Sequence, residues 1–165
     1  MTRVLKENLA SNEFLPVLPV KETPRRSKGI IHKERKLMFP GYILVQTEID
    51  ADLITDKLKF ELQTNIAVKK YFYSILHYGE NKKDVVVRER ERLHLERLFN
   101  PDFCVTGSVG FIEGGMIRVS SGALIGMESR IKRINRHKRE AIVEMEIMGA
   151  MSDVRLMLEV VEKAK

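Results

Sequence analysis

Residues 129–148, SRIKRINRHKREAIVEMEIM, carry the pattern that decides the fold of the second half of the chain. Apolar residues recur with a period of about two over Ser129–Ile134 and over Ala141–Met148, which is typical of a β-strand with one buried face. The residues between these runs, Asn135–Arg139, are all polar. The pattern therefore predicts a β-hairpin with Asn135–Arg139 at its tip.

The predicted hairpin is strongly basic, with six Lys or Arg and no acidic residue over 130–139. In a simple register Lys132 faces Glu144 and Arg130 faces Glu146, so we expect cross-strand ion pairs there. The other cations have no such partner, and arginine suits bidentate phosphate recognition. The candidates for contacts with nucleic acid are Arg133, Arg136, His137, Lys138 and Arg139. The alternative is a tip that is merely solvated.

Short alternating runs surround this hairpin and predict a small all-β barrel. The expected strands are Val109–Ile112, Met116–Val119, Ser129–Ile134, Ala141–Met148 and Asp153–Val161. The breaker Asn100-Pro101-Asp102 precedes them, so a domain boundary is expected between about Asn100 and Gly107. We interpret the glycines of 107–115 as barrel turns, because no Gly-Lys-Ser/Thr ending and no helical pattern follows them.

The first half of the chain mixes helical and extended patterns, which predicts an α+β fold with an antiparallel hairpin. Asp50 is the expected N-cap of a helix whose apolar residues recur every four positions, at Ile54, Leu58 and Leu62. A second helix is expected over Arg88–Phe99, with Leu95, Leu98 and Phe99 on its inner side. The other expected elements are a helical fragment at Val4–Leu9, an edge strand at Phe14–Val20, a strand at Lys36–Ile49 bulged at Gly41, and a strand at Ala67–Leu76.

A second basic stretch, Lys21–Lys36, has seven Lys or Arg against two Glu. Pro24, Ser27 and Gly29 supply turn chemistry, so the stretch is expected to be a loop or a hairpin tip. It suits a polyanion but lacks the interleaved aromatic residues that stack on single-stranded bases. A solvated loop is again the alternative.

The composition limits the function classes. The chain has 165 residues, 44% hydrophobic and 32% charged, with a formal net charge of +6, enough core-forming material for one domain or two small ones. We expect no membrane span and no secretory signal, and hence a cytoplasmic protein. One cysteine and four scattered histidines predict no cofactor, no metal and no nucleophile with a positioned base. We therefore expect neither an enzyme nor a small-molecule substrate.

Two motifs carry a family resemblance. Lys36–Val45, KLMFPGYILV, resembles the signature strand of the N-terminal (NGN) domain of NusG-type transcription elongation factors, and Gly115–Gly149, with VSSGALIGME at 119–128, resembles their KOW domain. The resemblance implies an α+β NGN domain over 1–100, a linker over 101–107 and a small SH3-like all-β KOW barrel over 108–165. The family's first strand, which contains Trp-Tyr, has no counterpart here, so we expect an N-terminally incomplete NGN domain.

Within the family, the run Ile131–Ala141 is most similar to the LoaP antiterminators. This resemblance implies a role in transcription elongation and antitermination. The NGN domain would bind the clamp helices of the largest RNA polymerase subunit, and the KOW domain would bind an RNA hairpin in the nascent transcript. The implied RNA-binding residues are Lys132, Arg133, Arg136, His137, Lys138 and Arg139.

The resemblance also changes the interpretation of Phe39, Pro40, Gly41 and Tyr42. The pattern alone favours a bulged core strand over an exposed aromatic surface. The resemblance instead implies that these four residues contribute to the polymerase-binding surface.

Two other functions stay open. One is a general NusG factor whose KOW domain binds ribosomal protein S-ten or Rho; the family's Phe-Gly after the long KOW strand is Met148-Gly149 here. The other is a ribosome-associated KOW protein that uses both basic stretches against ribosomal RNA.

Overall fold

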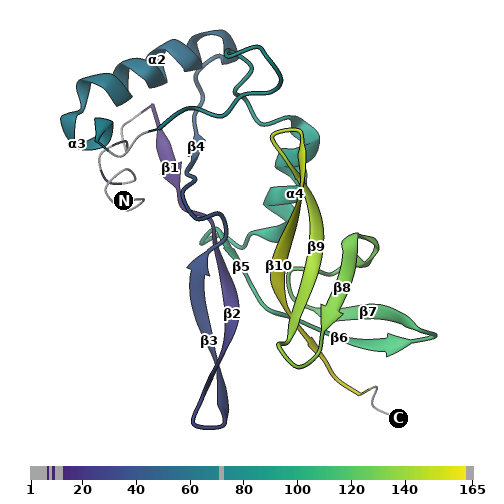
Figure 1. The fold of residues 1–165 in the computed structure, drawn as a ribbon. Coiled ribbons are helices and arrows are strands. Elements are labelled where there is room, and N and C mark those ends of the chain that lie inside the picture. Colours follow the sequence, from purple (N-terminus) through teal and green to yellow (C-terminus); the bar gives the residue numbers. More distant parts are fainter. Residues whose placement is uncertain (1–6, 8, 10–12, 71–72, 163–165) are drawn as a thin grey trace. The chain divides into compact units, whose positions relative to one another are not determined.

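The computed structural model of the chain describes residues 7, 9, 13–70 and 73–162 (Figure 1). It has mixed α+β structure, as the sequence patterns predict. The chain divides into two compact units: unit 1 comprises Met1–Pro19 and Phe39–Arg88, and unit 2 comprises Val20–Met38 and Glu89–Lys165. The expected helical fragment at Val4–Leu9 lies outside the described residues apart from Glu7 and Leu9.

Helix α2, Ala51–Thr64, is the main element of unit 1 and confirms the helix predicted after Asp50. The Asp50 side chain accepts a hydrogen bond from the Asp52 backbone N–H at 3.4 Å, as an N-cap does. The apolar residues spaced four apart lie on one face and are buried. Together with Leu9 and Phe14 they form the core cluster of this unit: Leu9, Phe14, Ile54, Leu58 and Leu62.

The strands of unit 1 are short. β1, Leu15–Val17, pairs antiparallel with β4, Leu44–Gln46. The continuous strand expected over Lys36–Ile49 is wrong, because β3 ends at Leu37 and regular structure resumes only at β4. A turn interrupts the run, since the Tyr42 backbone N–H donates to the Phe39 carbonyl at 3.1 Å.

The strand expected over Ala67–Leu76 is also wrong. Helix α3, Ile66–Lys69, follows α2 almost directly, and residues 73–76 have no regular secondary structure. The Lys69 N–H donates to the Asn65 carbonyl at 3.0 Å, so the backbone bonds locally as a helical turn. The β-branched and aromatic composition of this stretch is therefore overridden by its local hydrogen bonding.

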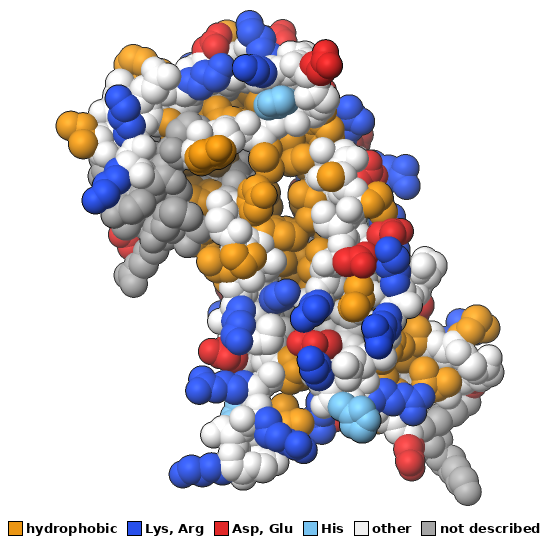
Figure 2. Space-filling view, in the orientation of Figure 1, with side chains coloured by type: hydrophobic (Ala, Val, Ile, Leu, Met, Phe, Trp, Pro, Cys, Tyr) orange, Lys and Arg blue, Asp and Glu red, His pale blue; other side chains and the backbone are white. Residues whose placement is uncertain are grey.

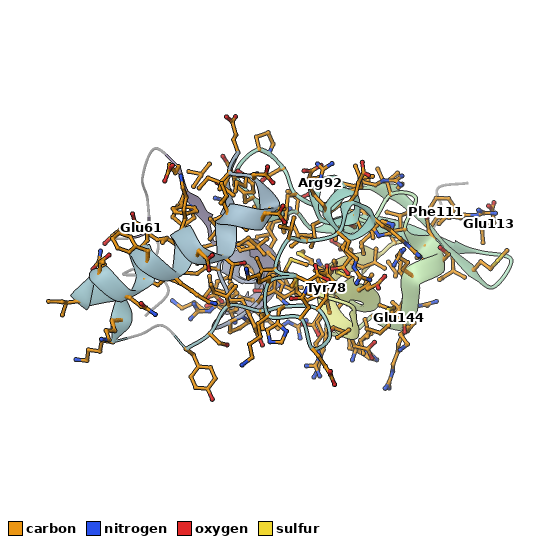
Figure 3. All side chains as sticks on the ribbon, turned by 90° about the horizontal axis from the view of Figure 1, so that it is seen from above. Glu61, Tyr78, Arg92, Phe111, Glu113 and Glu144 are labelled. Atoms are coloured by element: carbon orange, nitrogen blue, oxygen red, sulfur yellow. The ribbon has the colours of Figure 1, made fainter. Side chains whose placement is uncertain are left out.

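The segment after α3 is held by buried Tyr78, which Figure 3 labels. Its hydroxyl accepts the Arg88 backbone N–H at 3.1 Å, and the Arg88 guanidinium lies 4.2 Å from the centre of its ring. The Tyr78 N–H also donates to the Asp84 carbonyl at 2.8 Å. These contacts close the loop that precedes α4 without a strand.

A curled sheet forms most of unit 2, with strand order β7-β6-β10-β9-β8. The strands are β6 Ser108–Glu113, β7 Met116–Ser121, β8 Ile131–Asn135, β9 Glu140–Ile147 and β10 Ala150–Val160. The prediction of five short strands here is confirmed. A 3-10 turn, Glu128–Arg130, occupies the start of the strand expected from Ser129.

Strand β10 causes the curl because it changes partner along its length. Residues 150–157 pair antiparallel with β9, whereas Leu158–Val160 pair parallel with β6. Its inward residues Val154, Leu156 and Leu158 are buried, as the two-residue alternation predicts. The sheet is therefore a half-barrel around an apolar interior.

The loop after β7 closes tightly over the start of β6. Gly122 has a φ of +94°, and a Cβ atom there would lie 2.4 Å from the Gly107 carbonyl oxygen. Beside it, the buried Ser108 hydroxyl accepts the Leu124 N–H at 3.0 Å. Only glycine fits this position without moving the backbone.

A separate three-stranded sheet, β3-β2-β5, also belongs to unit 2. β2, Val20–Ser27, and β3, Ile30–Leu37, form a hairpin, and β2 pairs parallel with β5, Cys104–Val105. The Lys21–Lys36 stretch is thus an ordered ribbon. The expectation of a turn at Pro24 is wrong, because Pro24 lies inside β2, opposite Lys33 of β3. The pairing of β2 with β5 is confined to Val20 and Lys21, so Pro24 stands where β2 is an edge strand, which is where proline is tolerated.

Helix α4, Glu89–Leu98, confirms the helix predicted over Arg88–Phe99. Leu95 and Leu98 are buried, while Arg92 pairs with Glu96 at 2.7 Å on the outer side (Arg92 is labelled in Figure 3). The carboxyl group of Glu91 is buried and accepts hydrogen bonds from Met148 and Gly149 in the β9–β10 turn. The helix is thereby fixed to the half-barrel.

Candidate nucleic-acid interface

The turn between β8 and β9 presents the basic residues of the predicted hairpin tip. The Asn135 side-chain oxygen accepts the Lys138 backbone N–H at 3.0 Å, and the Arg139 N–H donates to the Arg136 carbonyl at 3.2 Å. Arg139 adopts a left-handed φ of 52°. These bonds fix the backbone of the tip, so its side chains project from an ordered turn.

Lys132 is neutralised by two carboxylates. Its ammonium lies 2.9 Å from Glu144 and 3.1 Å from Asp153, which confirms the predicted Lys132–Glu144 pair (Glu144 is labelled in Figure 3). The hydrogen bonds to Glu144 and Asp153 raise the pKa of Lys132. The strand has a register irregularity here, between Ile131 and Arg133. Lys132 therefore has less charge available for a ligand than its neighbours.

Arg139 also has an acidic partner, so the expectation that it is unpaired is wrong. Its guanidinium lies 2.8 Å from the Glu159 carboxylate, and both side chains are about two-thirds covered, with 35% and 32% exposed. Glu159 lies on β10, which the hairpin pattern alone does not place beside the tip. The Arg139 carbonyl accepts the Leu158 N–H at 2.9 Å, which holds the tip against β10.

Four candidate residues at the tip or on β8 just before it have exposed side chains. In the described part of the chain none of them has an ion-pair partner within 4.0 Å, in contrast to Lys132 and Arg139. They are Arg133, Arg136, His137 and Lys138. An unpaired cation keeps its full charge for a phosphate, and arginine can also bind it bidentately.

Arg130 does not form the expected pair with Glu146. It ends the 3-10 turn before β8, and its guanidinium nitrogen lies 3.1 Å from His94 Nε2. Burial and the positive charge of Arg130, with further basic neighbours, lower the pKa of His94. The simple register fails because the strand begins only at Ile131.

The β2–β3 ribbon is the second basic surface of unit 2. Its central cations are paired: Arg25 and Lys36 share Glu34 at 3.7 and 3.4 Å, and Lys33 lies 2.9 Å from Glu22. Among the residues that the structure describes, Arg26 and Lys28 near the turn have no acidic partner within 4.0 Å. Lys28 and Gly29 form the turn of this ribbon, and their positive φ angles of 50° and 80° are those of a two-residue hairpin turn. The glycine at the second position is the signal in the sequence for this turn.

The predicted polymerase-binding residues form a β-turn in unit 1. Pro40 and Gly41 occupy its centre, and Gly41 has the φ of +90° that a type II turn requires at its third residue. Phe39 is half-buried and Tyr42 is 51% exposed. The predicted bulged core strand is therefore wrong, and the turn presents an aromatic side chain to solvent.

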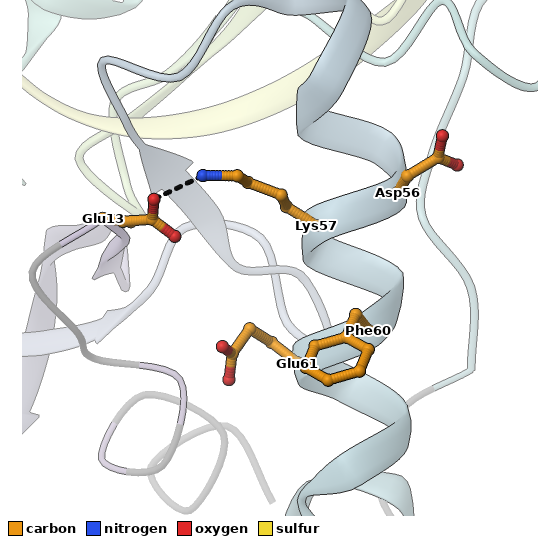
Figure 4. A pocket seen from close by; sticks show the side chains of 5 residues that line it. All are labelled: Glu13, Asp56, Lys57, Phe60 and Glu61. Carbon is orange, nitrogen blue, oxygen red and sulfur yellow. Dashed lines mark hydrogen bonds and ion pairs between the residues drawn. The ribbon is translucent and has the colours of Figure 1, made fainter.

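A shallow pocket of about 380 Å³ lies along α2 (Figure 4). Lys57 forms an ion pair with Glu13 at its edge, and the exposed ring of Phe60 lies on the same helix face. The lining combines Glu13, Asp56, Lys57, Phe60 and Glu61, with no nucleophile beside a base. This pocket offers no recognisable catalytic chemistry.

In the described ranges of the chain, no group of three or more His, Cys, Asp or Glu could hold a metal ion, and no helix is long and apolar enough to cross a membrane. Cys104 is buried, and burial raises the pKa of its thiol. Gly114 and Gly115 form the β6–β7 turn, which confirms the turn interpretation of these two glycines.

Comparison of the sequence with known protein families and with curated proteins finds no match.

Proposed function

We propose that the protein is a NusG-type transcription elongation factor that acts as a LoaP-like processive antiterminator. Its N-terminal NGN-type part binds the clamp helices of RNA polymerase through a surface that includes Phe39–Tyr42. Its C-terminal KOW-type part binds a hairpin in the nascent RNA. The two motifs KLMFPGYILV and VSSGALIGME, in this order along the chain, are the sequence basis of the proposal.

The observation that carries the RNA half is the set of exposed side chains without an ion-pair partner at the β8–β9 tip and on β8 just before it: Arg133, Arg136, His137 and Lys138. An ordered turn that carries several exposed cations binds phosphates without a large entropic cost of ordering its backbone. Arginine and lysine charges also give the salt-dependent attraction that nucleic acids require.

The exposed Phe39–Tyr42 turn supports the polymerase half. Tyr42 combines an apolar ring with a hydroxyl, a residue type that is enriched in protein interfaces. The turn belongs to unit 1 and the basic tip to unit 2. Each partner therefore has its own compact unit, which fits a protein that links an enzyme to an RNA signal.

The general NusG function is favoured less. Its ribosomal and Rho contacts would use the Met148-Gly149 turn, where both backbone N–H groups already donate to Glu91. A partner at this turn would have to compete with a buried carboxyl group.

The proposal is tested by selecting RNA hairpins with the full chain at physiological salt, against scrambled and single-stranded controls. The variant Arg136→Glu/Lys138→Glu is expected to lose the selected RNA and to keep binding to core RNA polymerase. Tyr42→Ala is expected to do the reverse. A matched charge reversal in unit 1, Lys59→Glu/Lys82→Glu, controls for net charge.

Failure to enrich any RNA structure would refute the antiterminator function. Binding to ribosomal protein S-ten or Rho in that case would support the general factor, and co-sedimentation with ribosomes instead of polymerase would support the ribosomal protein. Loss of polymerase binding in the tip variant would contradict the division of the two sites between the two units.

A further inference from the structure

We propose that the β2–β3 ribbon is a second RNA-binding arm and that the two arms, the ribbon and the β8–β9 tip, bind one double-helical RNA stem. This inference rests on the proposed function, because it assumes that the tip binds RNA. It adds a binding surface, Arg26 and Lys28, and assigns the contacts of both arms to the helical stem of the hairpin.

The base of the ribbon is built into unit 2. The Lys21 ammonium donates a hydrogen bond to the Arg155 carbonyl at 2.8 Å, and the Glu22 carboxylate accepts the Gly107 N–H at 2.7 Å. Burial lowers the pKa of Lys21. β2 also pairs with β5, whose Cys104 and Val105 are buried. The ribbon therefore starts from a fixed point beside β10.

The ribbon and the tip point the same way. Figure 1 shows the β2–β3 turn and the β8–β9 turn at the same end of unit 2, while the β9–β10 turn lies at the other end. Both arms are bonded to β10: the Lys21 ammonium donates to the Arg155 carbonyl, and the Leu158 N–H donates to the Arg139 carbonyl. Figure 2 shows Lys and Arg side chains gathered over this end of the unit.

The free charge of the ribbon lies toward its turn. Glu22 and Glu34 neutralise most cations of its lower part, as described above, whereas Arg26 and Lys28 have no acidic partner among the described residues. Arg26 lies six residues and Lys28 eight residues beyond Val20, which places them roughly 20 and 26 Å from the base of the ribbon. The ribbon can thus reach phosphates that lie away from those contacted by the tip.

The absence of an aromatic platform favours a helical stem. In unit 2 no described Phe or Tyr is among the exposed large hydrophobic residues; the exposed Tyr42, Phe60 and Tyr73 all belong to unit 1. Proteins that bind single strands stack bases on such side chains, whereas double-stranded RNA is recognised by its shape and its phosphates. Two rigid arms with cations fit the second mode.

The test compares three double variants of the full chain that remove the same charge: Arg26→Gln/Lys28→Gln, Arg136→Gln/Lys138→Gln, and Lys59→Gln/Lys82→Gln in unit 1 as control. Each is titrated with a selected RNA stem over a salt series. Each arm variant is expected to weaken binding roughly tenfold and to reduce the logarithmic salt slope by about 1.8. The control is expected to match the unchanged protein.

Stem length gives a second, independent readout. Halving the stem removes the phosphates of the second arm, so we expect Arg26→Gln/Lys28→Gln to have little further effect on the short stem, while Arg136→Gln/Lys138→Gln still weakens it. If Arg26→Gln/Lys28→Gln lost the same affinity on the long and the short stem, binding of one helix by both arms would be contradicted.

The outcomes separate this inference from the proposed function. If only the tip variant weakens binding, the second arm is refuted and the RNA-binding tip stands. If the unchanged chain binds no RNA, both fail. Tighter binding to a single strand, or to a DNA duplex of the same sequence, would overturn the assignment to an RNA stem.

Discussion

The carboxyl group of Glu91, in the first turn of α4, accepts the backbone N–H of Met148 at 2.7 Å. Its other oxygen accepts the N–H of Gly149 at 3.0 Å, and only 2% of Glu91 is exposed. One side chain thus satisfies both amides of the turn that joins β9 to β10. These bonds tie the helix to a turn more than fifty residues later in the sequence.

Glu91→Ala is expected to destabilise unit 2 by about 1–3 kcal/mol, because two amides lose their acceptor and the buried carboxyl group is removed from its site. Amide hydrogen exchange at Met148 and Gly149 should accelerate. In Glu91→Gln, which keeps one acceptor oxygen, the exchange rates should lie between those of Glu91→Ala and those of the unchanged protein. Glu89→Ala, on an exposed side chain of the same turn, is the control and should stay within about 0.5 kcal/mol. Unchanged exchange in Glu91→Ala would show that the bonds contribute nothing.

Gly122→Ala is expected to disrupt the packing of the loop after β7 against the start of β6. Its Cβ would lie 2.4 Å from a backbone carbonyl, so the backbone must shift. Gly114→Ala is the matched control, since Gly114 also has a positive φ but open space around it, and should cost only the conformational strain of about 1–2 kcal/mol. Thermal unfolding should rank the two variants, and an equal loss would contradict the close approach.

The imidazole of His94 should titrate below 6.5, because burial and Arg130 disfavour its protonated form. Between pH 6.5 and the lower pKa of the folded state, the unfolded chain binds more protons than the folded chain, so stability falls with pH over this window and levels off below it. Proton NMR of the ring gives the pKa directly. Arg130→Gln should raise it, whereas Arg118→Gln, whose guanidinium is near Glu113, should not. A His94 pKa above 6.5 would contradict the arrangement.

Freeing Arg139 should strengthen RNA binding. Glu159 holds its guanidinium at 2.8 Å, so Glu159→Gln is expected to raise RNA affinity a few-fold and to steepen the salt slope by about one unit. Arg139→Gln should weaken binding less than Arg136→Gln. Glu80→Gln, which removes the same charge from unit 1, serves as control, and an equal gain in it would assign the effect to net charge alone.

Local patterns predicted the β8–β9 hairpin and its Lys132–Glu144 pair, because both strands and both partners lie within twenty residues. The Arg139–Glu159 pair was missed since its partner lies on a third strand. The Pro40-Gly41 signal for a turn was present but was interpreted as a bulge. At α3, local hydrogen bonds outweighed residue preferences that favour a strand.

The long-range parts of unit 2 could not be read from spacing. β5 has only two residues, and nothing near it specifies that it joins β2. Glu91 looked like one more charge on an amphipathic helix, because its acceptor role depends on a distant turn. Patterns therefore predicted single elements and neighbouring pairs, and contacts between distant segments decided the rest.

The parallel pairing of β2 with β5 also delays the completion of this sheet during translation. Val20 leaves the ribosome about eighty residues before its partner Cys104, an interval on the order of 4–16 s at bacterial and eukaryotic elongation rates. During that interval the ribbon has an unpaired edge at its base, where nascent chains are vulnerable to wrong strand pairing. Unit 2 can therefore complete its fold only after translation of β5 to β10. Chaperone dependence should be greatest while the edge of β2 is still unpaired.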